Sequence, residues 1–113
     1  MSDCIFCKIV AGEIPSDIIY EDKNMIVFND IDQRAPVHVL IVPKKHIASL
    51  DSIEPEDTKI IGEIFGNIKD IAVKLGLDNG YRIVNNCGED ALQTVQHIHF
   101  HLLGGRKLQW PPG

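Results

Sequence analysis

A long amphipathic helix, predicted between two groups of short strands, constrains the fold of this chain more than any other feature. Residues 55–75 repeat apolar side chains at the three- and four-residue spacing of a single helix face. Pro55 suits the first turn of that helix, and Gly76 suits its end. The apolar face comprises Ile60, Ile61, Ile64, Phe65, Ile68, Ile71, Ala72 and Leu75. Such a face must be buried, and a sheet formed by the flanking strands can bury it.

Short strands are predicted before and after this helix. Their segments combine β-branched or aromatic residues with turn-forming residues at the ends, and they cover residues 16–21, 25–29, 37–42, 81–85 and 98–103. Residues 3–11 are expected to form a short helix or turn, which Gly12 and Pro15 end. This order predicts an α+β fold, with an antiparallel sheet of about five strands, one long helix and a short N-terminal helix. One helix leaves a sheet face or edge uncovered, which predicts a homodimer.

The size and charge of the chain exclude several classes of protein. Its 113 residues are enough for one domain, spanning residues 1–113, and too few for two. The net charge is -5 and no basic stripe is present, so we expect no nucleic-acid partner. No apolar run approaches the roughly 18 to 20 residues of a membrane span, and the N-terminus lacks the pattern of a secretory signal. We therefore expect a cytoplasmic protein without a membrane partner.

Histidine alternates with apolar residues near the C-terminus. In a strand, His97, His99 and His101 would point to one face, while Ile98 and Phe100 would point into a core. Lysine, threonine or glutamate is the commoner choice for a merely solvated face, so the pattern indicates chemistry. Three histidines can bind a catalytic zinc with an open fourth position. Alternatively, imidazole can act as a nucleophile and an acid or base near neutral pH. The spacing alone leaves both chemistries open.

The chain resembles the histidine triad family over nearly its whole length. The segment His97–Arg106, HIHFHLLGGR, is similar to the histidine triad motif, in which three histidines alternate with other residues. Further blocks look like the nucleotide-binding branch of that family, and they occur in the order 4–9, 35–47, 80–86 and 110–113. The last block is the tail Trp-Pro-Pro-Gly. One motif could arise by chance, but this ordered set is specific.

The resemblance implies an enzyme that hydrolyses or transfers nucleotides at the α-phosphate. This branch of the family prefers purine nucleoside phosphoramidates such as AMP-lysine or AMP-NH2, so the expected substrate is a purine nucleotide such as an AMP, GMP or adenosine-like compound. The expected chemistry forms a covalent nucleotidyl-histidine and needs no cofactor. The resemblance also implies a homodimer whose two sheets join, with the Trp110 tail near the partner's active site. Gln109 stands where a histidine is frequent, which bears on the leaving group.

The resemblance also assigns roles to individual residues. His99 would be the nucleophile, His101 would contact the phosphate, and His38 would assist proton transfer or position the phosphate. Asn86 and Thr94 would hydrogen-bond the phosphate region or the leaving group. The implied nucleotide-binding set is Phe28, Asp30, Ile31, Leu40, Asn86, Thr94 and His101, with Asp30 on the ribose hydroxyls. A histidine can attack phosphorus when its other ring nitrogen is held by an acceptor, often a backbone carbonyl.

Cysteine usage predicts a structural zinc site. Cys4 and Cys7 form a CxxC pair, which supplies half of such a site, and two histidines complete it. His46 and His97 are the candidates, and some family members with CxxC near the start bind zinc in this way. The zinc would pin the N-terminal segment to the sheet. The alternatives are free thiols, or a redox pair, although no thioredoxin-like pattern follows the motif.

Three other functions compete with the phosphoramidase. A dinucleoside polyphosphate hydrolase or nucleotidyl transferase would use the same nucleophile. A zinc-stabilised nucleotide-binding or protein-interaction module would make turnover incidental. A zinc hydrolase would use the three strand histidines together as metal ligands.

Overall fold

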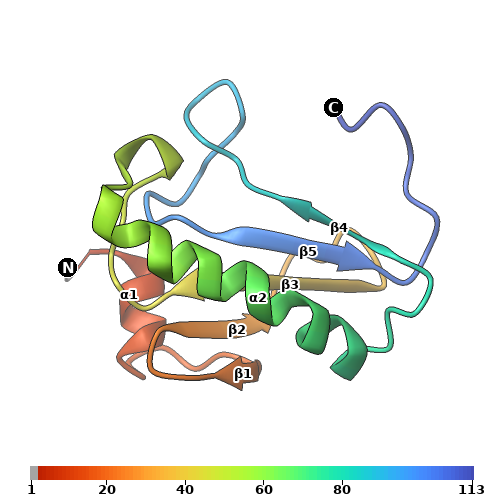
Figure 1. Cartoon of the computed structure of the whole chain (residues 1–113), viewed down its shortest axis with the longest axis horizontal. Helices are drawn as coiled ribbons and strands as arrows, with labels where there is room; N and C mark the ends of the chain where they lie inside the picture. Colours follow the sequence, from red (N-terminus) through yellow and green to blue (C-terminus); the bar gives the residue numbers. More distant parts are fainter. Residues whose placement is uncertain (1–2) are drawn as a thin grey trace.

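The computed structural model describes residues 3–113 and shows a sheet with α2 lying across one face and α1 at the other (Figure 1). The helices are α1 (Ile5–Val10) and α2 (Thr58–Lys74), and short 3-10 turns cover Leu50–Ser52 and Pro55–Asp57. The strands are β1 (Ile18–Glu21), β2 (Met25–Asn29), β3 (Val37–Pro43), β4 (Tyr81–Val84) and β5 (Phe100–Gly104). Within residues 3–113 these strands form one antiparallel sheet in the order β1-β2-β3-β5-β4. The α+β fold predicted from the sequence is therefore confirmed.

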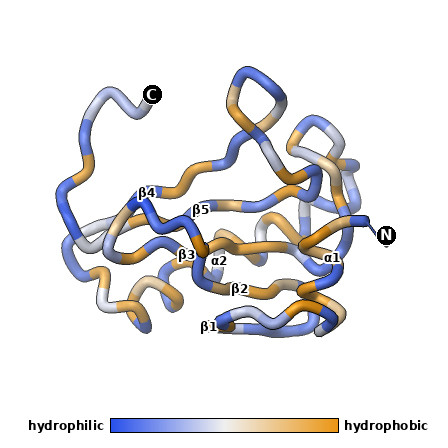
Figure 2. The backbone as a smooth tube through the Cα atoms, turned by 180° about the vertical axis from the view of Figure 1, so that it is seen from behind, coloured by the Kyte–Doolittle hydropathy of each residue, from blue (hydrophilic) through white to orange (hydrophobic). Residues whose placement is uncertain are grey.

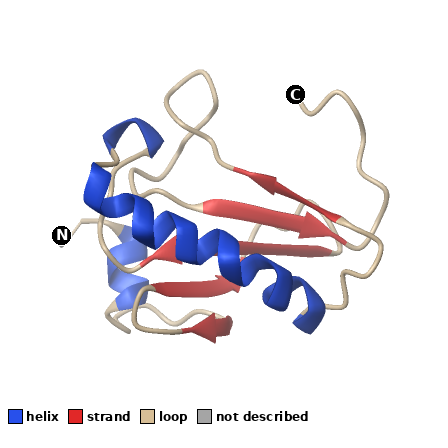
Figure 3. Ribbon diagram, viewed as in Figure 1, coloured by secondary structure: helices blue, strands red, loops and turns tan. Residues whose placement is uncertain are grey.

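The register of the central strands brings two predicted site residues together. In the β3–β5 pair, His38 lies opposite Leu103, and Leu40 lies opposite His101. Side chains two positions apart on a strand share a face, so His38 and His101 project from the same side of the sheet. The helix α2 crosses one face of the sheet (Figure 3), and it packs on Val39 and Ile41, which alternate with His38, so it lies on the other side.

The face under α2 holds the larger part of the core. Ile64, Ile68, Ile71 and Ala72 of the helix pack on alternate residues of the central strands, namely Met25, Val27, Val39, Ile41, Phe100 and Leu102. The hydropathy trace shows the apolar residues concentrated along these strands (Figure 2). Phe65 was predicted to lie on the buried face, but it is 50% exposed, although its ring packs edge-on against Phe100. It lies at the margin of the apolar stripe and covers the core only partly.

A smaller core lies on the opposite face, under α1. Phe6 and Ile9 of α1 pack there with Phe28, Leu40 and Val42 of the sheet. With six residues, α1 is too short to be stable alone, so it depends on these contacts. The short N-terminal helix predicted from the sequence is confirmed.

The ends of the elements show where sequence patterns were less exact. The predicted helix of residues 55–75 begins with a 3-10 turn before α2, and Gly76 ends it with a positive φ of 74°. The predicted strand of residues 98–103 pairs regularly only from Phe100, although Ile98 remains in the core and its backbone N–H donates to the Ile47 carbonyl. The first predicted strand begins at Ile18 rather than at residue 16.

Over residues 3–113, α2 is the longest helix, and no helix there has the length and apolar character needed to cross a membrane.

Candidate functional site

A cavity of about 540 Å³ opens on the sheet face that carries α1. Its walls come from α1, the segment after it, β2, β3 and the segment leading into β5. The lining residues are Ile5, Phe6, Ile9, Ile14, Pro15, Ser16, Asp17, Phe28, Asn29, Asp30, Ile31, Leu40, Thr94, Val95, His99 and His101. One cavity thus brings together apolar and polar residues of the predicted site, namely Phe28, Asp30, Ile31, Leu40, Thr94, His99 and His101.

The ring of His99 has a fixed orientation. Its Nδ1 lies 2.8 Å from the backbone carbonyl of His97. A carbonyl only accepts hydrogen bonds, so Nδ1 carries the proton and donates it, and Nε2 keeps its lone pair. The ring is buried and packs edge-on against Phe6 and His101, with centroid distances of 5.1 Å and 5.2 Å. His99 therefore presents an unprotonated nitrogen at the cavity, as a nucleophile requires.

His38 and His101 form a chain of hydrogen bonds beside His99. The backbone N–H of Arg34 donates to Nδ1 of His38 at 3.0 Å, so the proton of neutral His38 resides on Nε2. That Nε2 lies 2.9 Å from Nδ1 of His101 and 3.2 Å from a carboxylate oxygen of Asp30. Nδ1 of His101 consequently accepts, and its proton resides on Nε2. His101 thus offers the cavity an N–H donor.

Burial keeps this pair uncharged. Loss of hydration lowers the pKa of His101 to about 4, and the neighbouring His99 and His38 add to the effect, whereas Asp30 opposes it. Burial likewise lowers the pKa of His38, against the opposing charge of Asp30. Both imidazoles are therefore neutral at pH 7. An anionic phosphate placed beside them would raise their pKa values, because opposite charge favours the protonated form.

A second cluster of potential metal ligands surrounds Nδ1 of His97. Nδ1 of His97 is 3.3 Å from Sγ of Cys4, 3.6 Å from Sγ of Cys7 and 3.2 Å from Nδ1 of His46. Sγ of Cys7 is also 3.3 Å from Nδ1 of His46. Nε2 of His97 donates to the carbonyl of Pro43 at 2.8 Å, so its Nδ1 keeps the lone pair. The residues of the predicted zinc site therefore converge.

These distances match the edges of a tetrahedral zinc site. With Zn–S bonds of about 2.3 Å and Zn–N bonds of about 2.0–2.1 Å, the edges are about 3.4 Å between nitrogens and about 3.6 Å between nitrogen and sulfur. The backbone carbonyl that fixes the tautomer of His97 is the usual outer partner of a ligating histidine. Burial and the neighbouring Cys4 raise the pKa of the Cys7 thiol, so the site needs a cation to favour its thiolate form. The residues present fit zinc.

Asp30, His38 and His101 also lie within ligating distance of one another, but their protons oppose metal binding. Nε2 of His38 points at the other two groups and carries a proton, because Nδ1 of the same ring already accepts from Arg34. Among the described residues, no group of converging ligand atoms combines His97, His99 and His101. The geometry therefore disfavours the zinc hydrolase that the histidine spacing alone left open.

Sequence reasoning missed the contribution of α1 to this site. Ile5, Phe6 and Ile9 line the cavity, and Phe6 packs its ring against both His97 and His99. The position of Phe6 between the two cysteines was the available signal. Asn86 is not among the residues that line the cavity. Its neighbour Asn85 donates from its side chain to the backbone carbonyl of His99 at 2.9 Å.

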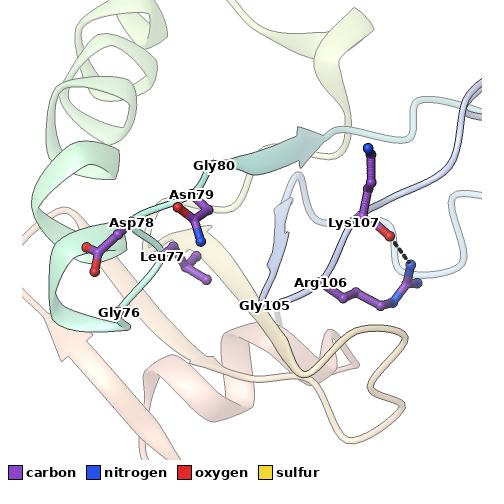
Figure 4. A pocket seen from close by; sticks show the side chains of 8 residues that line it. All are labelled: Gly76, Leu77, Asp78, Asn79, Gly80, Gly105, Arg106 and Lys107. Carbon is purple, nitrogen blue, oxygen red and sulfur yellow. Dashed lines mark hydrogen bonds between the residues drawn. The ribbon is translucent and has the colours of Figure 1, made fainter.

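Another pocket lies at the opposite end of the sheet, between the turn after α2 and the segment after β5 (Figure 4). It is lined by Gly76, Leu77, Asp78, Asn79, Gly80, Gly105, Arg106 and Lys107. The guanidinium of Arg106 donates to the backbone carbonyls of Lys107 and Arg34, so it is already occupied. This pocket contains none of the predicted site residues. Trp110 lies elsewhere, exposed, with its ring 5.8 Å from the Arg82 guanidinium carbon.

Comparisons with known proteins agree with this geometry. Residues 3–109 match the family model described as "Scavenger mRNA decapping enzyme C-term binding". An uncharacterized HIT-like protein of Synechococcus elongatus is 49% identical over 111 residues, which cover 98% of this chain and 97% of that protein. A HIT family hydrolase of Legionella pneumophila is 47% identical, with a TM-score of 0.95 over 98% of this chain and 100% of that one. A histidine triad protein of Clostridium difficile is 48% identical, with a TM-score of 0.93 over 96% of each chain.

The fold and the paired histidine clusters define a protein of the HIT-like class. The chain belongs to the histidine triad (HIT) family. The family resemblance that the sequence motifs indicated is thereby confirmed.

Proposed function

We propose that this protein is a nucleotide hydrolase that cleaves the phosphorus–nitrogen bond of purine nucleoside 5'-phosphoramidates. The observation that carries the proposal is the orientation of His99, whose Nδ1 donates to the carbonyl of His97 and whose Nε2 is unprotonated at the cavity. The nucleoside would pack against the apolar side chains of Phe28, Ile31 and Leu40. Asp30 would accept hydrogen bonds from the ribose hydroxyls, and Thr94 would hydrogen-bond the phosphate region.

In the first step, Nε2 of His99 attacks the α-phosphorus and the phosphorus–nitrogen bond breaks. The bound phosphate anion raises the pKa of the His38–His101 pair, so the complex takes up a proton there. The added proton resides on Nδ1 of His101, and the Nε2–H of His38 then donates to the Asp30 carboxylate, which lies 3.2 Å away. Nε2 of His101 gives its own proton to the departing amine and is left with a free lone pair. The products of this step are the free amine and a nucleotidyl group on His99.

In the second step, water attacks the same phosphorus and the bond to Nε2 of His99 breaks. The proton of the water passes to the His38–His101 pair, which restores its charge, and the nucleoside monophosphate leaves. The carbonyl of His97 stabilises the positive charge on the His99 ring while the nucleotide is attached, because that ring then carries its proton on Nδ1. The ring nitrogens of this chain supply the chemistry without a cofactor.

We also propose a structural zinc at Cys4, Cys7, His46 and His97, on the strength of the ligand spacing and the His97 tautomer. In this role, zinc adds stability by joining three separate segments of the chain. Thiols available to a metal suit a reducing compartment, which supports a cytoplasmic location.

We also propose that the protein forms a homodimer. β4 lies at one edge of the sheet, and Tyr81 on it is exposed. Pairing of two β4 strands would join two sheets and cover an edge that otherwise presents unpaired backbone groups. Sedimentation or light scattering of the purified protein tests this part.

The reaction is tested by quenching the protein with acid-free denaturant during turnover of AMP-lysine and mapping the adduct by mass spectrometry. We expect an added AMP on the peptide that carries His99, and none in His99→Ala. Cys87→Ser serves as a matched control, because Cys87 does not line the cavity and is outside the cysteine–histidine cluster. Faster turnover of a dinucleoside polyphosphate than of AMP-lysine would assign the protein to the polyphosphate hydrolases instead. Turnover without an adduct would overturn the covalent step.

A further inference from the structure

We infer that occupancy of the cysteine–histidine site by zinc controls the nucleotide affinity of the neighbouring cavity, through α1 and through the main chain of His97. The inference rests on the proposed function for its ligand, AMP, and for the metal. It adds a thermodynamic coupling between two sites that share residues.

The first connection is the helix α1. Cys4 precedes this helix and Cys7 lies within it, so zinc would hold both ends of its first turn. Between them, Phe6 points into the cavity and packs against the Phe28 ring at a centroid distance of 5.7 Å. Because α1 is only six residues long, its position depends on tertiary contacts and on such ties. Loosening the metal site would therefore move one wall of the nucleotide cavity.

The second connection is His97 itself. Its ring is completely buried, with Nδ1 among the thiols and Nε2 bonded to the carbonyl of Pro43. Its own carbonyl accepts the hydrogen bond that orients His99. One residue thus joins the metal cluster to the residue that faces the phosphate. Movement of the His97 ring toward solvent after loss of the metal would release this carbonyl from its present position.

The third connection is the packing of Phe6 on both rings. Its centroid lies 5.9 Å from that of His97 and 5.1 Å from that of His99, edge-on in each case. Phe6 therefore contacts a metal ligand, the nucleophile and the cavity at once. Its apolar partners Ile26, Phe28, Leu40 and Val42 keep α1 attached even without a metal, so the coupling should be graded rather than all-or-none.

Coupling of this kind is reciprocal. If zinc raises the affinity for AMP by some factor, then AMP raises the affinity for zinc by the same factor. Couplings between sites in proteins are commonly about 5- to 150-fold. Given the remaining apolar contacts of α1, we expect a factor of about ten.

The test compares AMP binding by calorimetry for the zinc-loaded protein and for His46→Ala. His46 is exposed, so its removal weakens the metal site without leaving a cavity in the core and without changing α1. We expect the Kd for AMP to rise about ten-fold, and the Kd of Cys87→Ser to stay unchanged. Far-UV circular dichroism must be the same for all proteins at the temperature used. A chromophoric chelator, competing for zinc with and without AMP, should give the same factor.

Phe6→Leu provides a second measurement. This variant keeps all four metal ligands, so it should still bind zinc, but the ratio of AMP affinities between loaded and chelator-treated protein should fall toward one. Equal AMP affinity in zinc-loaded and zinc-free wild-type protein would overturn the inference and leave the proposed reaction standing. Failure of the purified protein to take up zinc would also overturn it. Failure of zinc-loaded wild-type protein to bind AMP would overturn the proposed function together with the inference.

Discussion

Two clusters of histidines lie side by side in this protein and differ in where their protons reside. In the cysteine–histidine cluster, the Nε2–H of His97 donates to the carbonyl of Pro43, and the lone pair on Nδ1 faces the thiols. In the His38–His101 pair, a backbone N–H occupies Nδ1 of His38, and a proton points into the cluster instead. Ligand spacing is similar in both, since the candidate atoms of each lie within 4.8 Å of one another. The backbone partners, rather than the spacing, distinguish the proposed metal site from the proposed proton relay.

The comparison also shows how one segment serves both clusters. His97 directs its ring to the thiols and its carbonyl to His99. The three alternating histidines therefore divide between two sites. His97 belongs to the cysteine–histidine cluster, whereas His99 and His101 line the cavity.

Removal of the proposed nucleophile should have the largest effect. His99→Ala eliminates the attacking nitrogen, so turnover of AMP-lysine should fall by about 10⁴-fold or more, as in enzymes that lose a covalent nucleophile. Zinc content should not change, because His99 is outside the metal cluster. Single-turnover kinetics and metal analysis of the same sample check both points. A variant that keeps more than a tenth of the wild-type rate would contradict the assignment.

Loss of His97 should act mainly on stability. Its ring is fully buried and is a proposed zinc ligand, so His97→Ala removes packing and a metal ligand together. We expect a loss of about 3–5 kcal/mol, which corresponds to a fall in Tm of about 10–20 °C for a domain of this size. Calorimetric melting and zinc analysis measure the effect. Unchanged Tm and full zinc content would remove His97 from the metal site.

His38 should matter for rate and not for metal. His38→Phe removes the hydrogen bond that holds Nδ1 of His101, so kcat should fall by about 10²-fold. Zinc content should match that of the wild-type protein. If instead zinc were lost along with activity, the His38–His101 pair would not be independent of the cysteine–histidine cluster.

The smallest expected effect is on the pH dependence of stability. The pKa of His101 is about 4 in the folded protein, below the ordinary value of 6.5, so the unfolded chain binds more protons between these pH values. Stability from this source is complete above pH 6.5 and is lost as the pH falls toward 4. Because the ring retains some solvent contact, we expect a loss of about 1–2 kcal/mol between pH 7 and pH 5.

Denaturant unfolding of the wild-type protein and of His101→Asn at both pH values measures this term. The variant should lose less stability than the wild-type protein over the interval, and contributions from the metal site cancel in the difference. Equal losses in the two proteins would show that His101 is not held neutral by its surroundings.

Much of the fold followed from patterns that are local in the sequence. The helical spacing of Ile64, Ile68 and Ile71 predicted α2 and its buried face, and Gly76 predicted its end. The burial of Ile98 and Phe100 also followed from alternation. The exposure of Phe65 did not, because a residue at the margin of an apolar stripe is covered or not according to the width of the sheet beneath it.

The sequence predicted which residues form the candidate site, but it did not predict how their side chains are oriented. Alternation places His97, His99 and His101 on one side, yet the orientation of each ring depends on carbonyls and N–H groups that the fold brings from elsewhere. Pro43 and Arg34 are such partners, and each is distant or inconspicuous in the sequence. The role of Phe6 depends in the same way on where α1 packs.

The protonation pattern of the imidazoles is the most direct test of this account. Long-range ¹H–¹⁵N correlation spectra of the zinc-loaded protein at pH 7 report which ring nitrogen of each histidine carries the proton. The account predicts a proton on Nδ1 of His99 with Nε2 bare, and the opposite tautomer for His38. A proton on Nε2 of His99 would leave the cavity without a nucleophile and would contradict the account.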